Sequence, residues 1–145
     1  NPFGKLPALV HEDPAVPGGR LQLFESGAIL LYLAELSGEC SSSAQRSLAA
    51  QWVLFANATL ATALFVPSSR EKEFPRLMGV LNGLLDGGKS LMGDSWGVAD
   101  CAVNAYLAYL PMFFPDLDLS PYPAVQANIA ATQARPAYRK VMGLA

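Results

Sequence analysis

Charged and metal-binding side chains are scarce in this chain of 145 residues. Charged residues make up only 15% of the sequence and hydrophobic residues 52%, which indicates a globular protein rather than a disordered one. The net charge of −2, with lysine and arginine scattered along the chain, excludes a protein that binds nucleic acid through a basic surface. The single histidine, His11, excludes a His-rich metal site, and its acidic neighbours Glu12 and Asp13 predict a solvated position in a turn.

Cysteine and long apolar runs are also scarce. Cys40 and Cys101 lie far apart in the sequence, so the chain has neither a CxxC pair nor a disulfide framework. This usage is typical of a reducing compartment. Cys101 follows an acidic residue in an apolar segment, which predicts an inert, buried thiol. The longest apolar runs, residues 27–34 and 60–66, are shorter than the ~20 residues that a membrane-spanning helix needs, so we expect no membrane span.

The first 25 residues predict a β-hairpin. Residues 5–10 form a short apolar run that predicts a strand, and residues 21–24 alternate apolar and polar side chains as a half-buried strand does. Between them, residues 12–19 contain two prolines and a Gly-Gly pair, which cannot sustain the hydrogen bonds of a strand ladder. The two strands are therefore expected to pair antiparallel and to pack on a further element.

Helical periodicity dominates the rest of the sequence. Leucine and isoleucine recur at helical spacing after Ser26, and Gly38 stops this first helix. Residues 38–43, rich in serine, form a linker by composition and divide the chain into residues 1–38 and residues 43–145. Beyond the linker, apolar spacing predicts helices over residues 44–65, 71–92, 98–110, 123–132 and 136–142. The predicted fold class is therefore α+β and mostly α.

Prolines and glycines define the expected ends of these helices. We expect Pro67 to end the helix over residues 44–65, and Pro75 to lie in the first turn of the next helix, where a missing N–H costs nothing. Gly97 and Asp100 predict a capping box at the start of the third helix, with the carboxylate reaching back to the Gly97 N–H. This third helix is apolar nearly all round, so we expect it at the centre of the bundle.

Two short motifs point to a known family: Gly4-Lys5-Leu6-Pro7-Ala8-Leu9 and Phe24-Glu25-Ser26-Gly27-Ala28-Ile29. Together they resemble the glutathione-binding half of a glutathione S-transferase, namely the last two strands and the last helix of its thioredoxin-like domain. The resemblance continues through residues 50–57 and ends with the stretch Arg135-Pro136-Ala137-Tyr138. The pattern looks like theta- or phi-type transferases, including plant and cyanobacterial transferase-like proteins, and it is also similar to the N-terminal domain of elongation factor 1 gamma.

The resemblance implies a partial thioredoxin-like subdomain, a β-hairpin plus helix over residues 1–38, followed by an all-helical bundle over residues 43–145. Because sequence pattern alone cannot separate the two uses of each residue, both readings stay open for the serine and the lysine of the motifs. Ser26 can cap its helix, and the same geometry at the helix N-terminus can also bind the γ-glutamyl carboxylate of glutathione, so these two roles are not exclusive. Lys5 either pairs with the glycyl carboxylate or is an exposed strand lysine.

Three further residues complete the glutathione site that the resemblance implies. Pro7 would be a cis-proline, and Leu6 before it would offer its backbone N–H and C=O to the cysteinyl part of the ligand. Glu25 would face the α-ammonium group of glutathione. No metal site is implied.

The function implied by the resemblance is transfer of the glutathione thiol, with glutathione as co-substrate, to a small apolar electrophile. The family keeps its catalytic Tyr, Ser or Cys at a position before Asn1, so we assign no catalytic residue and expect conjugation to depend on an upstream segment. The candidates for the electrophile pocket, which also fit a plain core, are aromatic: Trp52, Phe55, Tyr106, Tyr109 and Phe113.

The alternative function is a non-catalytic scaffold that holds a protein partner, as in elongation factor 1 gamma. Either function implies a homodimer or a protein complex. The resemblance also implies a cytoplasmic protein, with the chloroplast stroma as the second compartment.

Overall fold

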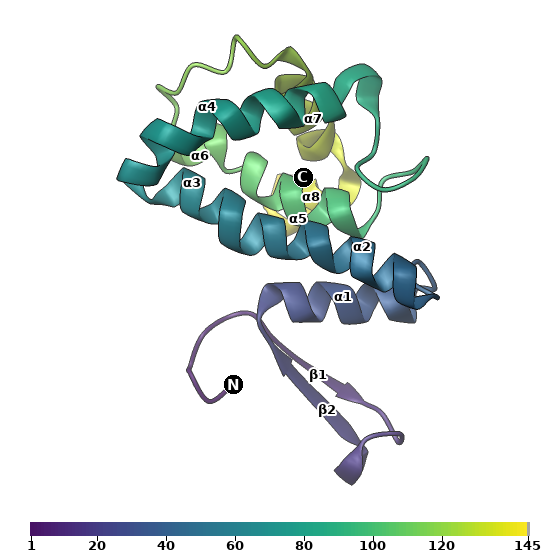
Figure 1. The fold of residues 1–145 in the computed structure, drawn as a ribbon. Helices are drawn as coiled ribbons and strands as arrows, with labels where there is room; N and C mark the ends of the chain where they lie inside the picture. Colours follow the sequence, from purple (N-terminus) through teal and green to yellow (C-terminus); the bar gives the residue numbers. More distant parts are fainter. Residues whose placement is uncertain (145) are drawn as a thin grey trace.

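The computed structural model describes residues 1–144, in which a β-hairpin and one helix lie beside a bundle of helices (Figure 1). Strand β1, Ala8–Glu12, pairs antiparallel with strand β2, Arg20–Phe24, so that Ala8 lies opposite Phe24. This confirms the predicted hairpin. Strand β1 begins three residues later than predicted because Pro7 has no N–H for the ladder, and a 3-10 turn, Pro17–Gly19, joins the two strands.

His11 lies in strand β1, so the prediction of a turn position is wrong, although the side chain is exposed as expected. Its Nδ1 atom shares a hydrogen bond of 2.5 Å with the hydroxyl of Tyr32. Tyr32 belongs to helix α1, Ser26–Leu36, which follows the hairpin directly. The pair therefore ties the hairpin to the helix that connects it to the bundle.

Helix α1 packs against a long helical rod that we call the α2–α3 rod. The rod consists of helix α2, Ser43–Leu54, a π-helical segment, Phe55–Leu60, and helix α3, Ala61–Phe65. It matches the helix predicted over residues 44–65. Figure 1 shows the rod crossing between α1 and α5.

The α2–α3 rod is 23 residues long and is apolar enough, by length and composition, to cross a membrane. A core helix of a globular protein meets the same criterion. In this chain, the rod turns a row of residues into the hydrophobic core: Ala49, Val53, Ala56, Leu60, Ala63 and Leu64. The rod is longer than the apolar runs counted in the sequence because the helix continues through polar residues such as Asn57.

Helix α4, Pro67–Leu84, begins and ends earlier than predicted. Val66 has extended backbone angles and ends the rod, and Pro67 then occupies the first turn of α4, because its fixed φ suits that position. Pro75 consequently lies in the middle of α4, and the prediction of a first-turn position is wrong. The helix ends before Gly87, whose φ of 70° favours glycine, so the predicted continuation to residue 92 is wrong as well.

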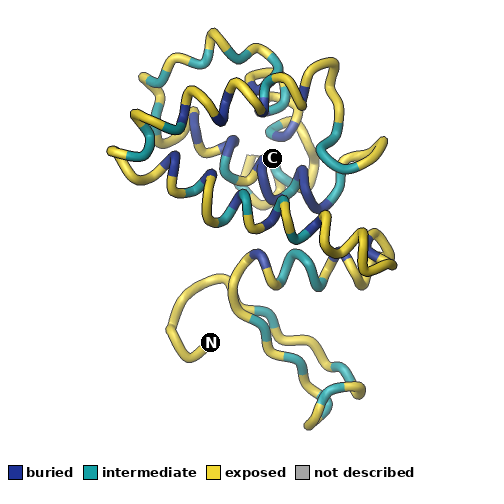
Figure 2. The backbone as a smooth tube through the Cα atoms, in the orientation of Figure 1, coloured by how far each residue is buried: buried dark blue, intermediate teal, exposed yellow. Residues whose placement is uncertain are grey.

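Helix α5, Val98–Leu107, lies at the centre of the bundle as predicted, and seven of its ten residues are buried. Its predicted extension to residue 110 is instead a separate short helix, α6, Leu110–Phe113. Helices α7, Pro123–Ala134, and α8, Pro136–Val141, confirm the two predicted terminal helices to within two residues. Figure 2 shows that the buried residues concentrate in the bundle, whereas the hairpin is exposed or half-buried along its length.

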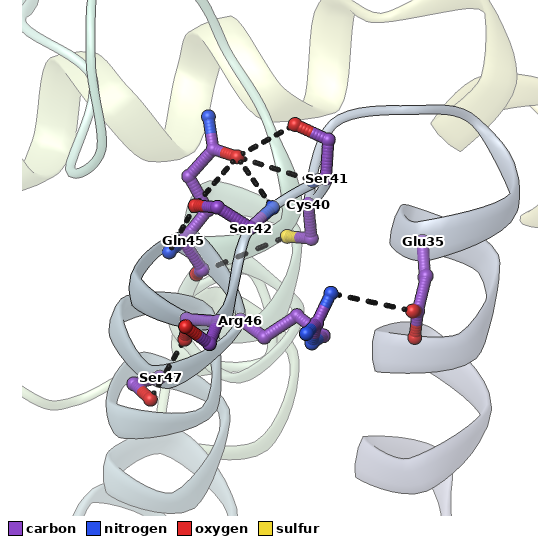
Figure 3. Close-up of polar contacts among 8 residues, drawn as sticks. Glu35, Cys40, Ser41, Ser42, Gln45, Arg46 and Ser47 are labelled. Atoms are coloured by element: carbon purple, nitrogen blue, oxygen red, sulfur yellow. Dashed lines mark hydrogen bonds and ion pairs between the residues drawn. The ribbon is translucent and has the colours of Figure 1, made fainter.

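The start of α2 is fixed by polar contacts that surround the linker (Figure 3). The Ser42 hydroxyl accepts a hydrogen bond from the Gln45 N–H at 3.2 Å, and Gln45 Oε1 accepts one from the Ser42 N–H at 3.0 Å. This reciprocal pair is a capping box. Cys40, 1% exposed, buries the middle of the linker in the core. The linker is therefore a fixed structural connection between α1 and α2.

The start of α5 is fixed by two carboxylates. Asp100, 1% exposed, accepts hydrogen bonds of 3.0 Å from the Gly97 N–H and from the Leu91 N–H, which confirms the predicted capping box. Glu39 from the linker accepts a hydrogen bond of 2.7 Å from the Val98 N–H. A Cβ atom on residue 97 would collide with Glu39 Oε1, so the glycine makes room for this carboxylate. Glu39 thus does the work of a capping side chain that Gly97 lacks.

We expect Glu39→Ala to lower the free energy of unfolding by about 1 kcal/mol, because the Val98 N–H loses its acceptor. In that background Gly97→Ser is expected to restore much of the loss, because the space left by Glu39 admits a hydroxyl at the capping position. Urea unfolding of the two single variants and the double variant measures both effects. If the losses in the free energy of unfolding add up in the double variant, Gly97 does not serve to make room for the Glu39 carboxylate.

Candidate functional site

A cavity of about 440 Å³ lies between the first half of α1 and the face of α5. Pro7 before the hairpin and Ser26 at the start of α1 both line it, which brings together the two motifs separated in the sequence. The remaining wall is mostly apolar: Gly27, Ile29, Leu30, Leu33, Asn57, Cys101, Ala102, Ala105, Tyr106 and Tyr109. The arrangement offers a polar end near Ser26 and an apolar wall along α1 and α5.

The peptide bond between Leu6 and Pro7 is cis, as the resemblance implied. Leu6 is 92% exposed. Within residues 1–144, no protein group hydrogen-bonds to its backbone N–H or C=O. These two backbone groups are therefore available to a peptide-like ligand, which they would hold as a strand edge holds an added strand.

Ser26 is the first residue of α1, and its side chain does not cap the helix. The capping interpretation of this serine is therefore wrong. Its Oγ atom instead lies 3.4 Å from the amide nitrogen of Asn57, which donates to it. The first backbone hydrogen bond of the helix is donated by the Ile29 N–H, so the N–H groups of residues 26–28 point outward without intrahelical acceptors. A helix N-terminus of this kind attracts an anion.

Glu25 precedes the helix with φ of 71° and ψ of 121°, and among residues 1–144 it is the one non-glycine residue with a positive φ. Such a conformation costs free energy in a residue with a Cβ atom, and it is concentrated at functional sites. Lys5 and Glu25 are exposed and lie outside the cavity wall. Glu25 directly precedes Ser26 in the sequence, and Lys5 lies two residues before Pro7. The structure therefore brings Pro7 and Ser26 together in one cavity wall, whereas Lys5, Leu6 and Glu25 do not line it.

The five aromatic candidates separate into two groups. Tyr106 and Tyr109 line the cavity, and Phe113 stacks edge-on against Tyr109 at 5.3 Å between ring centroids. Trp52 and Phe55 instead line a separate groove of about 270 Å³ between α2 and α4. Trp52 and Phe55 therefore do not line the cavity that contains Tyr106 and Tyr109.

Among the residues of the cavity wall that were not predicted as site residues, Asn57 and Cys101 carry an amide and a thiol. Asn57 lies 31 positions from Ser26 in the sequence, and a π-helical segment turns it toward the cavity. Cys101 is half-buried in the cavity wall rather than fully buried. Loss of solvation raises the pKa of its thiol, Glu39 and Asp100 raise it further, and Arg135 lowers it in part. Loss of solvation likewise raises the pKa of the Tyr106 hydroxyl.

Comparison with known proteins identifies the family. The model of the glutathione S-transferase N-terminal domain matches residues 1–35, and the model of the C-terminal domain matches residues 50–140. The chain therefore belongs to the glutathione S-transferase family, with the thioredoxin-like and helical parts that the sequence motifs indicated.

Individual relatives agree with this assignment. The chain is 35% identical to the disulfide-bond oxidoreductase YfcG of Escherichia coli, over 94% of this chain and 71% of that protein. It is 34% identical to the glutathione S-transferase-like protein OpS6 of Beauveria bassiana, over 97% of this chain and 73% of that protein. Among solved structures, a glutathione transferase from Pseudomonas putida with one glutathione disulfide bound per subunit superposes with a TM-score of 0.70. That match is 32% identical and covers 96% of this chain and 69% of the other.

We expect the thiol of Cys101 to react slowly with iodoacetamide at neutral pH, because its raised pKa keeps it protonated. The alkylation rate should rise only above the ordinary pKa of about 9, later than that of the same cysteine in urea-unfolded protein. Mass spectrometry of a Cys40→Ser variant follows Cys101 alone. Alkylation at pH 7 as fast as in the unfolded chain would contradict the pKa direction.

Proposed function

We propose that this protein binds glutathione at the polar end of the cavity and transfers its thiol to a small apolar electrophile held against the apolar wall. The observation that carries the proposal is the start of α1, where Ser26 and Gly27 line the same cavity as Pro7 and the N–H groups of residues 26–28 have no intrahelical acceptor. This site attracts a carboxylate by hydrogen bonding and by the positive end of the helix dipole.

Each group of glutathione has a counterpart in the proposed site. The γ-glutamyl carboxylate lies at the Ser26 hydroxyl and the helix N-terminus, and the Glu25 carboxylate pairs with the α-ammonium group. The Leu6 backbone pairs with the cysteinyl residue, and Lys5 pairs with the glycyl carboxylate. The family to which the chain belongs, and the glutathione disulfide bound by the Pseudomonas relative, support this ligand.

The reacting nucleophile in this proposal is the thiol of glutathione, so the protein contributes orientation and surroundings. Ile29, Leu33, Ala105 and Tyr109 offer the apolar surface that an electrophile would cover. Neither Cys101 nor Tyr106 is assigned the task of lowering the pKa of the glutathione thiol, because the Tyr106 hydroxyl already donates its hydrogen to Asn57 Oδ1 and the Cys101 side chain carries only a weak S–H donor. A non-catalytic scaffold remains the alternative function.

Thiol–disulfide exchange is a second candidate reaction for the same site. The name of the Escherichia coli relative, a disulfide-bond oxidoreductase, and the disulfide bound by the Pseudomonas relative favour it. In this reaction the glutathione thiolate attacks a disulfide sulfur, forms a mixed disulfide and releases the other sulfur as a thiolate. The site would hold glutathione in the same way for both reactions.

We further propose a homodimer that buries the exposed apolar side chains of α2 and α4. Leu48 is 50% exposed, Val80 55% and Leu84 45%, and the last two border the groove that contains Trp52 and Phe55. An apolar patch that combines two helix faces with a groove is typical of a protein interface. A second copy of this chain would cover it, because the same patch on both copies is self-complementary.

We expect Ser26→Ala to weaken glutathione binding about tenfold, because the ligand carboxylate loses a charge-assisted hydrogen bond. Isothermal titration calorimetry measures the dissociation constant. Ser47→Ala, which removes an exposed hydroxyl from α2, should leave it unchanged.

Turnover assays with an apolar electrophile and with a disulfide separate the functions. Conjugation supports transfer to an electrophile, and disulfide reduction supports the second reaction. Glutathione binding without turnover of either substrate favours the scaffold, and wild-type protein that binds no glutathione overturns the proposed site.

We expect light scattering to give twice the chain mass for the wild-type protein and the chain mass for Val80→Glu, because a charge in the groove opposes burial. Val141→Glu serves as the control, since Val141 is 84% exposed on α8, away from the proposed interface. A wild-type monomer at micromolar concentration would overturn the homodimer.

A further inference from the structure

We propose that Asn57 is a positioning residue that sets the direction in which the Ser26 hydroxyl donates its hydrogen bond, and that Tyr106 holds Asn57 in place. The three side chains form a relay from the apolar wall of the cavity to its polar end. This inference rests on the proposed function, because it takes the γ-glutamyl carboxylate of glutathione as the acceptor for Ser26.

The relay consists of two hydrogen bonds among three elements. The Tyr106 hydroxyl, from α5, donates to Asn57 Oδ1 at 3.2 Å. Asn57 Nδ2, from the π-helical segment of the rod, donates to Ser26 Oγ at 3.4 Å at the start of α1. The rod contacts both α1 and α5, so one amide side chain on it reaches both helices (Figure 1).

The local backbone confines the Asn57 amide to this bridging position. A Cβ atom on Gly27 would lie 2.8 Å from Asn57 Nδ2 and 2.7 Å from Val53 Cγ1, so α1 and the rod approach as closely as a glycine permits. The π-helical segment changes the angular spacing of side chains along the rod, and such segments are frequent at functional sites. Asn57 is half-buried there, so an unpaired amide would carry a desolvation cost.

The direction of the two hydrogen bonds determines what Ser26 can do. A hydroxyl has one hydrogen to donate and two lone pairs to accept with. Because the Asn57 N–H occupies a lone pair of Ser26 Oγ, the serine keeps its own hydrogen for another acceptor. A carboxylate at the start of α1 can only accept, so it fits this direction. Hydrogen bonds that run in one direction polarise and strengthen one another.

The hydrogen bond from Tyr106 to Asn57 runs in the same direction as the one from Asn57 to Ser26, and it begins in the apolar part of the cavity. Loss of solvation raises the pKa of its hydroxyl, so the group remains a protonated donor to Asn57 through the neutral pH range. Tyr106 also lines the cavity wall. A change at Tyr106 is therefore transmitted to glutathione affinity through Asn57, even though the glutathione carboxylate is bound by Ser26 in the proposed site.

The test compares two ligands on the full chain by isothermal titration calorimetry. One ligand is glutathione, and the other is an analogue in which a 4-aminobutyryl group replaces the γ-glutamyl group, so that only the α-carboxylate is missing. We expect Asn57→Asp to weaken glutathione binding at least tenfold, because it exchanges the N–H donor for an acceptor, and to change analogue binding by less than about twofold.

Tyr106→Phe should weaken glutathione binding roughly threefold and leave the analogue unchanged, because the relay loses one hydrogen bond. Tyr138→Phe is the control, since Tyr138 lies on α8, outside both the cavity wall and the relay. It should leave both dissociation constants unchanged. Thermal unfolding of each variant verifies that the fold persists.

Three results would overturn the relay, and they have different meanings. If the wild-type protein binds glutathione and Asn57→Asp binds it equally well, the relay is wrong and the proposed site stands. If Asn57→Asp weakens both ligands equally, Asn57 supports the fold and does not direct Ser26. If the wild-type protein binds no glutathione, the proposed function and the relay fail together.

Discussion

The close approach of α1 to the α2–α3 rod at Gly27 is the constraint on which the site depends. A residue with a Cβ atom at this position would meet the side chains of Val53 and Asn57, so any larger residue would push the two helices apart. The contact places Ser26 beside Asn57 and sets the width of the cavity between α1 and α5. Packing at one backbone position therefore defines the polar end of the candidate site.

The far end of α1 is held by the linker, which makes the helix a fixed wall of the cavity. Cys40 is buried in the core, and Glu39 accepts a hydrogen bond from the first residue of α5. Asp100 fixes the same end of α5 from within its own helix. Because α1 and α5 are joined at this end and spaced by the rod at the other, the cavity between them is set by folded structure before any ligand arrives.

The sequence predicted the hairpin and the central position of α5, because local residue patterns carry these features, and the family resemblance implied the cis Leu6–Pro7 bond. It misplaced α4, because Pro67 is compatible both with the end of one helix and with the first turn of the next. It could not find Asn57, because its contact with Ser26 depends on a π-helical segment and on packing between helices. Regular helical spacing, used to predict the face of the rod, does not include such a segment.

The distribution of polar groups in the cavity bears on whether the protein or its ligand supplies the nucleophile. The protein offers hydrogen-bond donors near Ser26 and an apolar wall beyond it, while the pKa values of both Cys101 and Tyr106 are raised by loss of solvation. Because these two groups stay neutral, neither of them competes with an anionic ligand for the helix N-terminus. These walls are consistent with the proposed function, in which the ligand supplies the nucleophile and the protein supplies its orientation.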